Sequence, residues 1–222
     1  MKKLNDFFNE NGYVIVKDFI STDILQSHYH YLLDMYKEGK MSVDKNQVVG
    51  NLTLRDDIVF DTLLSKMRPL ISKVVDKELW PTYAFTRLYR NGEKLKKHTD
   101  RESCEYSISL TLGFSNGRGI WPIYLKNKEG KTIKTKLEIG EALIYTGRDL
   151  PHWRKKFKGD HYVQTFLHYV DSEGPYKEWV FDKRQGLNSL DYDINFNFEK
   201  TGRNVDEYES FYEDKSFDEI IL

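Results

Sequence analysis

Three residues with metal-binding side chains are spaced so that they could meet at one point. His98 and Asp100 stand two positions apart, and side chains at i and i+2 of an extended segment point the same way. His152 follows the expected strand 142–145, where a neighbouring strand could bring it opposite that pair. Two imidazoles and one carboxylate on one face of a metal leave three positions open, the arrangement of non-heme Fe(II) centres. A triplet of this kind also arises by chance, so its structural setting decides between a metal site and three unrelated polar residues.

The setting is a run of short strands in the second half of the chain. Between 106 and 114 apolar residues alternate with small polar ones, as in a strand with one buried face. Further strands are expected over 120–125, 132–137, 142–145 and 162–170, separated by turns that include 116–119 and 127–130. Helices at the front and many short strands behind them predict an α+β protein with a β-sandwich or barrel core. The triplet would then open one strand of that core.

The N-terminal third is mostly helical in this prediction. A strand over 14–16 precedes an amphipathic helix from 24 to 35, for which Ser21 offers a capping hydroxyl. A second helix is expected from Ile58 to about Lys73, broken or bent at Pro69 because proline lacks a backbone donor.

One domain is expected over 1–185, with a helical part at 1–80 and a β-core at 81–171. Residues 186–222 form an acidic, aromatic C-terminal extension, in which 203–222 carry seven acidic side chains interleaved with aromatic and aliphatic ones. A terminal helix packed on the core by its aromatics, a mobile lid and an interaction tail all fit this pattern.

Composition excludes several classes of protein. The chain has 222 residues and a formal net charge of −1, which argues against a surface devoted to nucleic acid. Aromatic residues make up 14%, too many for a wholly disordered chain, and no apolar run is long enough to span a bilayer. The start has no secretory signal pattern, and the single Cys104 excludes thiolate-rich zinc sites and fits a reducing compartment. A cytoplasmic protein is expected.

Three stretches of the chain, taken in order, resemble a known family. Residues 7–21 are similar to an opening strand and helix start, 87–100 to a stretch that ends in an HxD motif, and 140–152 to the strand that leads to a distal histidine. The chain thereby resembles the 2-oxoglutarate- and Fe(II)-dependent dioxygenases, particularly their prolyl 4-hydroxylase-like and phytanoyl-CoA hydroxylase-like branches, over most of 7–170. The resemblance implies a double-stranded β-helix (jelly-roll, cupin-like) core with the N-terminal helices packed on one sheet.

The resemblance also implies cofactors and their ligands. His98, Asp100 and His152 would bind Fe(II), with 2-oxoglutarate as cosubstrate and O2 at the open positions. Tyr89 would bond a carboxylate of 2-oxoglutarate through its hydroxyl. The family pattern places an arginine or lysine after the distal histidine, and in this chain His161 occupies that position.

An imidazole holds a carboxylate less firmly than a bidentate guanidinium does. Arg154, Gln164 and Arg87 are therefore alternative partners for the far carboxylate of 2-oxoglutarate, and His161 could instead be a surface residue at the start of a strand.

The function implied is hydroxylation of a peptide side chain or small molecule, coupled to oxidative decarboxylation of 2-oxoglutarate. An AlkB-like nucleic-acid oxygenase is an alternative that needs a basic rim and a stacking platform. A non-catalytic, cupin-like metal-binding protein is another, and it would form no succinate.

Basic side chains crowd both halves of the expected site and fit an anionic substrate, if they line one mouth. Equally, they could decorate exposed strand ends and deter edge pairing. These residues are Lys94, Lys96, Lys97 and Arg101 around the triplet, and Arg148, Arg154, Lys155, Lys156 and Lys158 around His152. Trp121, Trp153 and Tyr124 could form an aromatic wall or belong to the core.

Overall fold

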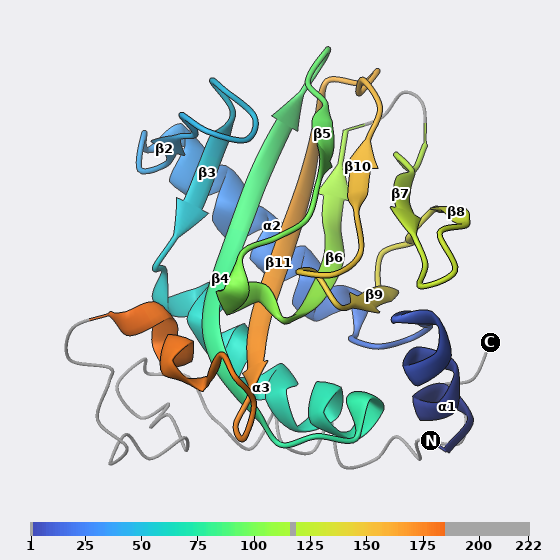
Figure 1. The fold of residues 1–222 in the computed structure, drawn as a ribbon. Helices are drawn as coiled ribbons and strands as arrows, with labels where there is room; N and C mark the ends of the chain where they lie inside the picture. The colour runs from blue at the N-terminus through green and yellow to red at the C-terminus, as the bar shows by residue number, and fades with distance from the viewer. Residues whose placement is uncertain (1, 116–118, 185–222) are drawn as a thin grey trace.

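Two antiparallel sheets face each other in the computed structural model, which describes residues 2–115 and 119–184 (Figure 1). The strands of the larger sheet are β1 (Tyr13–Val16), β2 (Ser42–Val43), β3 (Leu52–Arg55), β4 (Leu79–Arg90), β6 (Tyr106–Phe114), β9 (Ala142–Tyr145) and β11 (His161–Asp171). Those of the smaller sheet are β5 (Leu95–His98), β7 (Ile123–Lys126), β8 (Thr132–Thr135) and β10 (His152–Arg154). The strand orders are β1-β9-β6-β11-β4-β3-β2 and β5-β10-β7-β8, so sequence neighbours are often separated in space.

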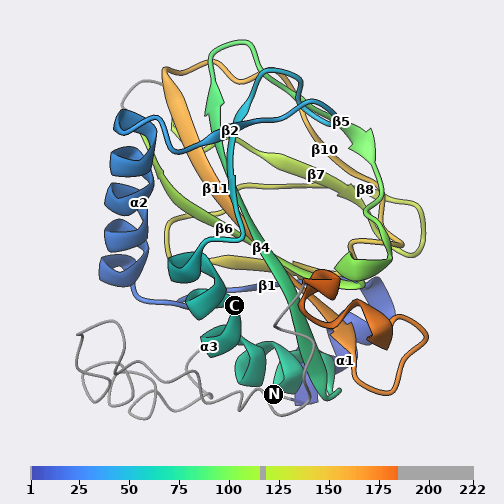
Figure 2. The same cartoon turned by 90° about the vertical axis from the view of Figure 1, so that its left-hand side faces the viewer.

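The helices lie on the larger sheet. They are α1 (Lys2–Asn11), α2 (Thr22–Lys37) and α3 (Ile58–Val75), with short 3-10 turns η1 (Glu102–Cys104) and η2 (Lys177–Lys183). Figure 2 shows α2 and α3 on the side of the larger sheet that faces away from β5, β10, β7 and β8. The predicted α+β arrangement, with helices packed on one sheet of a double-stranded β-helix, is confirmed.

Local sequence signals explain where the helices begin. The Ser21 hydroxyl accepts the backbone N–H of Ile24 at the start of α2, and the Asp57 carboxylate accepts those of Val59 and Phe60 at the start of α3. In contrast to the expected break, α3 continues through Pro69 as one helix. Its buried face, which includes Met67 and Ile71 on either side of that proline, packs against the larger sheet and outweighs the lost hydrogen bond.

Three apolar clusters fix the relative position of the layers. The largest lies between the helices and the larger sheet. Two smaller clusters lie between the sheets, one built around Tyr145 and Leu150 and the other around Tyr89 and Trp121. Each smaller cluster contains residues of both sheets and therefore holds the two sheets together. Polar residues line the remaining space between the sheets.

Some expectations fall outside the described residues. These are the extension over 186–222 and most of the turn at 116–119. The single domain over 1–185 stays a prediction. Across the part of the chain that the structure describes, no helix is both long enough and apolar enough to span a membrane.

Candidate metal centre

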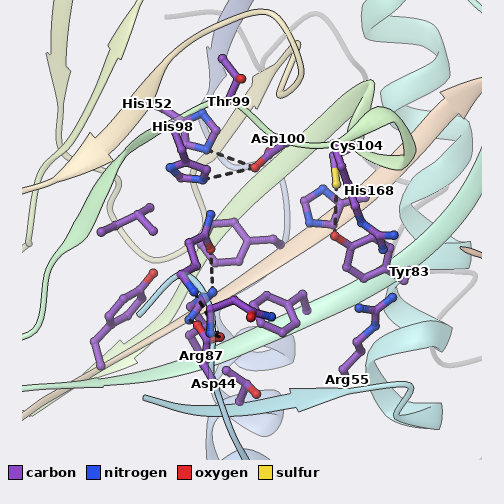
Figure 3. Close-up of a pocket in the computed structure, with 18 of the residues that line it drawn as sticks. Asp44, Arg55, Tyr83, Arg87, His98, Thr99, Asp100, Cys104, His152 and His168 are labelled. Atoms are coloured by element: carbon purple, nitrogen blue, oxygen red, sulfur yellow. Dashed lines mark hydrogen bonds and ion pairs between the residues drawn. The ribbon is translucent and has the colours of Figure 1, made fainter. Parts of the chain in front are cut away.

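The two histidines of the predicted site come together because their strands are neighbours. In the small sheet β5 and β10 are antiparallel, and His152 pairs directly with His98, with ring centroids 4.3 Å apart. Asp100 follows β5 by two residues and lies beside both rings (Figure 3). Its Oδ1 is 3.3 Å from Nε2 of His98 and 3.6 Å from Nε2 of His152. The structure thus brings His98, Asp100 and His152 to one point.

Both imidazoles are oriented by the backbone in the same way. Nδ1 of His98 lies 2.8 Å from the carbonyl oxygen of Lys96, and Nδ1 of His152 lies 2.9 Å from that of Leu150. A carbonyl oxygen can only accept, so Nδ1 of each ring carries the proton. The lone pair of each Nε2 is therefore free and directed to the Asp100 carboxylate. A ligand histidine needs this tautomer, and the partner of its other nitrogen fixes the ring.

The protonation states suit a cation. Burial alone would raise the pKa of Asp100, but the electrostatic interactions with the His152 and His98 rings outweigh it and lower the pKa. Burial lowers the pKa of His152, only partly offset by the Asp100 charge. Asp100 is thus ionised and His152 neutral at neutral pH, as metal ligation requires.

The geometry fits a metal with open positions. Adjacent ligand atoms on a metal with bonds of about 2.1 Å at right angles lie about 3 Å apart, close to the two Nε2–Oδ1 separations. The second carboxylate oxygen of Asp100, Oδ2, is buried and has no hydrogen-bond partner among the described residues. An unpartnered buried carboxylate oxygen is costly, which is the expected state of a ligand atom awaiting a cation.

Gly147 permits the close packing of Asp100. Its carbonyl oxygen accepts the Asp100 backbone N–H at 2.9 Å. A Cβ at this position would stand 2.5 Å from Asp100 Oδ2 and 2.7 Å from Ser107 Oγ. The carboxylate cannot keep its place beside such a carbon.

We therefore expect Gly147→Ala to weaken divalent metal binding about 10- to 100-fold, the usual cost of disturbing a ligand through its support. Calorimetric titration with Ni²⁺ measures this. Gly113→Ala is the matched control, because its Cβ would meet the Tyr29 ring at 2.7 Å, outside the metal site. Gly113→Ala should lower thermal stability and leave the metal Kd unchanged. Equal metal affinity in Gly147→Ala and the unaltered chain would contradict the placement of Asp100.

The three residues stand on the wall of a cavity of about 510 Å³. Its other walls come from β3, β4, β11 and the segment 44–47. Alternation along β4 places four side chains in the cavity wall: Tyr83, Phe85, Arg87 and Tyr89. Of these, only Arg87 and Tyr89 were expected from the sequence. His168 of β11 and Arg55 of β3 also line it and were missed. The period-two pattern of β4 could have revealed Tyr83, whereas Arg55 lies on a strand that the sequence analysis did not anticipate.

Two buried polar groups lie near Trp121: Tyr89, which lines the cavity, and Arg154, which lies outside its lining. Within the part of the chain that the structure describes, the buried Tyr89 hydroxyl has no hydrogen-bond partner, and burial raises its pKa, opposed in part by Arg87 and Arg154. The Arg154 side chain is also buried, between the rings of Trp121 and Tyr162. It donates to the Trp121 carbonyl and, at 3.0 Å, to Oε1 of Gln164.

Arg154 lacks a counter-charge. Within residues 2–115 and 119–184, no carboxylate forms an ion pair with it, and its Nε has no hydrogen-bond partner. Arg87 differs, because it donates to Asp44 and Gln47, at 2.6 Å in both cases. Burial would raise the pKa of Asp44, but backbone N–H groups and the Arg87 guanidinium lower it to about 2. Arg154 is thus the buried cation that needs an anion.

His161 lies apart from this cavity. Its Nε2 is 2.6 Å from the hydroxyl of Tyr29 on α2, and the two rings are stacked. The neighbouring inward positions of β11 are Tyr162 and Gln164, which contact Arg154. The structure therefore does not bring His161 together with the metal residues or with Tyr89.

Most of the basic residues singled out in the sequence do not line the cavity. Arg101 does, whereas Arg154 is outside the lining. Lys97 lies over Trp153 and Lys155 over Tyr124, and these two rings stack on each other. Trp153 alternates with the inward His152 and Arg154 on β10, so this aromatic pair is on the outer face of the small sheet. Trp121 is buried inside.

Comparison with known proteins gives no match to any protein-family model. An uncharacterized protein of Acanthamoeba polyphaga mimivirus is 25% identical over 156 residues, which cover 64% of this chain and 69% of that protein. Solved structures are similar at lower identity. A prolyl-4-hydroxylase of Pseudomonas putida has a TM-score of 0.63 at 14% identity, over 76% of this chain and 97% of that chain.

Two further structures are similar. A prolyl hydroxylase of Trichoplax adhaerens, in complex with a peptide fragment of the hypoxia inducible factor oxygen degradation domain, has a TM-score of 0.66 at 18% identity, over 82% of this chain and 92% of that one. The epimerase SnoN, in complex with Fe3+, alpha ketoglutarate and nogalamycin RO, has a TM-score of 0.66 at 10% identity, over 85% and 91%. At these identities the likeness shows a shared fold, that of the 2-oxoglutarate-dependent oxygenases.

Proposed function

We propose that the chain is a 2-oxoglutarate- and Fe(II)-dependent oxygenase that hydroxylates a peptide side chain or a small molecule. The observation that carries this proposal is the convergence of two free Nε2 atoms and a carboxylate with an unpartnered oxygen on the wall of a cavity. The shared fold adds support, because SnoN, which has it, was crystallised with Fe3+ and alpha ketoglutarate.

His98, Asp100 and His152 would hold the metal. The backbone carbonyls of Lys96 and Leu150 keep both rings in the ligating tautomer, so little reorganisation accompanies binding. Three ligands on one side leave the positions toward the cavity open. Iron bound there, with 2-oxoglutarate and O2, supplies the oxidising chemistry, and the chain's own residues supply position and a shielded pocket.

Arg154 and Tyr89 would hold the far carboxylate of 2-oxoglutarate. An anion at this place would neutralise the guanidinium and occupy both the free Arg154 Nε and the free Tyr89 hydroxyl. Arg154 stands two residues after His152 on β10, and the two side chains face the same side of the strand. The far carboxylate of 2-oxoglutarate and the metal would therefore bind at successive positions along β10. In this proposal Arg154 takes the role that the family pattern had suggested for His161.

Conversion of 2-oxoglutarate to succinate tests this function without knowledge of the substrate. We expect the Fe(II)-loaded chain to form succinate slowly under air, and Zn²⁺, Co²⁺ or Ni²⁺ to inhibit by taking the same ligands. His28→Ala is a matched control, because that histidine lies on α2 with Nδ1 2.8 Å from the Ile24 carbonyl, away from the cavity. It should retain activity, whereas His98→Ala should lose it. Succinate formation no greater than in His98→Ala would favour the non-catalytic metal-binding alternative.

A further inference from the structure

A carboxylate of the chain itself sits between two arginines of the cavity wall. Two arginines line the cavity: Arg55 at the end of β3, and Arg101, which directly follows Asp100 in the sequence. Nη2 of Arg101 donates to both carboxylate oxygens of Asp182, at 2.7 and 2.9 Å, and Nη2 of Arg55 donates to one of them. The Asp182 side chain is only 7% exposed, whereas those of Arg55 and Arg101 are 37% and 39% exposed. Two accessible guanidinium groups thus converge on one carboxylate.

Tyr83 holds the two guanidinium groups in place. Their central carbons lie 4.3 Å (Arg55) and 4.8 Å (Arg101) from the centroid of its ring. The ring belongs to the inward face of β4 and also lines the cavity, and Figure 3 shows Arg55 next to it. Stacking on a rigid strand residue prearranges both arginines for an oxyanion and reduces the ordering that binding would require.

The backbone that delivers Asp182 is strained. Phe181, Asp182 and Lys183 have φ angles of 50°, 55° and 57°, three successive non-glycine residues in the left-handed region. Side chains disfavour this region, and occupation by consecutive residues is rarer still. The contact of Asp182 with Arg55 and Arg101 is one of the restraints on this segment, together with the hydrogen bonds of Arg184 to Asp61 and to the Thr82 carbonyl.

We propose that Arg55 and Arg101 bind a carboxylate of the substrate, and that Asp182 is an internal occupant which this carboxylate displaces. The proposal deepens the proposed function, because it assigns the substrate a carboxylate that binds beside Asp100 while another part of the molecule faces the metal. A carboxylate that enters the cavity can make the same hydrogen bonds to the two arginines as Asp182 does. Asp182 then moves into solvent, so the exchange leaves no unpaired buried charge.

The test measures binding of a probe to the full chain loaded with Ni²⁺ and N-oxalylglycine. The probe is N-acetylaspartate methylamide, a copy of the displaced side chain, and the neutral comparison is N-acetylasparagine methylamide. Titration calorimetry gives the Kd, and the arginine Nε–H signals in NMR locate the site. In Asp182→Asn the competitor is weakened while the left-handed backbone stays acceptable, because asparagine tolerates it.

We expect Asp182→Asn to bind the acidic probe at least about tenfold more tightly than the unaltered chain, because an internal occupant lowers apparent affinity by the fraction of open sites. The neutral probe should bind neither protein. Asp56→Asn is the matched control: Asp56 is also left-handed, at φ 56°, and contacts Arg55 at 3.6 Å and Arg184 at 3.3 Å, but it forms no ion pair with Arg101 in the described part of the chain. It should bind the probe as the unaltered chain does. Adding Arg101→Gln to Asp182→Asn should abolish the gain.

Equal affinity of Asp182→Asn and the unaltered chain, or equal binding of the neutral probe, would overturn the proposal and make Asp182 a structural tie. Tighter binding of inorganic phosphate than of the acidic probe would overturn the assignment to a carboxylate. The arginine signals are read without turnover, so probe binding in a chain that forms no succinate would leave this site standing and remove the oxygenase function alone.

Discussion

Asp100→Ala should abolish 2-oxoglutarate turnover, with a loss of about 10³-fold or more, and leave the metal-free fold intact. A bound metal contributes several kcal/mol to the reaction, and each 1.4 kcal/mol is a factor of about ten in rate. Among the carboxylates that the structure describes, Asp100 is the one that lies beside both histidines. Its removal leaves two neutral imidazoles, which hold a divalent cation weakly. Succinate formation by the Fe(II)-loaded protein gives the rate.

Thermal unfolding separates loss of metal from loss of fold. The unaltered chain should gain stability when Ni²⁺ is added, since a ligand of the folded state stabilises it. Asp100→Ala should unfold near the metal-free temperature of the unaltered chain, with no gain from Ni²⁺. Asp149→Ala is the matched control, because its side chain is 61% exposed in the same region. Full activity in Asp100→Ala would remove this carboxylate from the metal shell.

Arg154→Met should raise the KM for 2-oxoglutarate by about 10²-fold, and Arg154→Lys by less. Truncation of one partner of a buried charge pair costs several kcal/mol of binding free energy. Lysine keeps the positive charge but lacks the two parallel N–H donors with which a guanidinium binds a carboxylate. The effect should fall on KM more than on kcat, because the far carboxylate is held alike in the ground state and the transition state. Initial rates of succinate formation over a range of 2-oxoglutarate concentrations measure both constants.

Arg87→Lys is the comparison that decides between the two buried arginines. Its guanidinium is already paired with Asp44, so its replacement should change the KM for 2-oxoglutarate little. Arg154 is a buried charge without an ion-pair partner in the described part of the chain, so Arg154→Met breaks no ion pair there. The unfolding temperature of the ligand-free chain should therefore not fall in this variant, in contrast to a variant in which an ion pair is broken. A larger KM effect in Arg87→Lys than in Arg154→Met would transfer the carboxylate to Arg87.

The convergence of His98, Asp100 and His152 could be predicted from sequence because it depends on strand periodicity. His98 and Asp100 face one way by the i, i+2 rule, and the expected strand 142–145 placed His152 near a neighbouring strand. The direct pairing of His152 with His98 required a long-range register between β5 and β10, which no local pattern contains. The resemblance of the three stretches supplied that information instead.

The proposed partner of the far carboxylate was less predictable for a physical reason. The family pattern pointed to His161, but a difference of one position reverses which face of a strand a side chain takes. The loop 155–160 sets that offset, and β11 turns Tyr162 and Gln164 inward and His161 toward Tyr29. Arg154 was one of several options in the sequence. Its lack of a counter-charge, which distinguishes it from Arg87, is a property of three-dimensional packing.

The arginine pair at the cavity wall lay beyond sequence reasoning. Arg55, Arg101 and Asp182 are far apart along the chain, and Asp182 reaches them only through an unusual left-handed backbone. The continuous course of α3 through Pro69 shows the same limit of local signals, because tertiary packing decides the outcome.

A crystal structure of the full chain with Mn²⁺ and N-oxalylglycine would show the metal and the far carboxylate together. Anomalous scattering at the manganese edge locates the metal without assumptions about its ligands. We expect one manganese bound by Nε2 of His98, a carboxylate oxygen of Asp100 and Nε2 of His152, with the far carboxylate of N-oxalylglycine on Arg154 and Tyr89. Manganese at any other place, or His152 turned away from it, would rule out this metal centre.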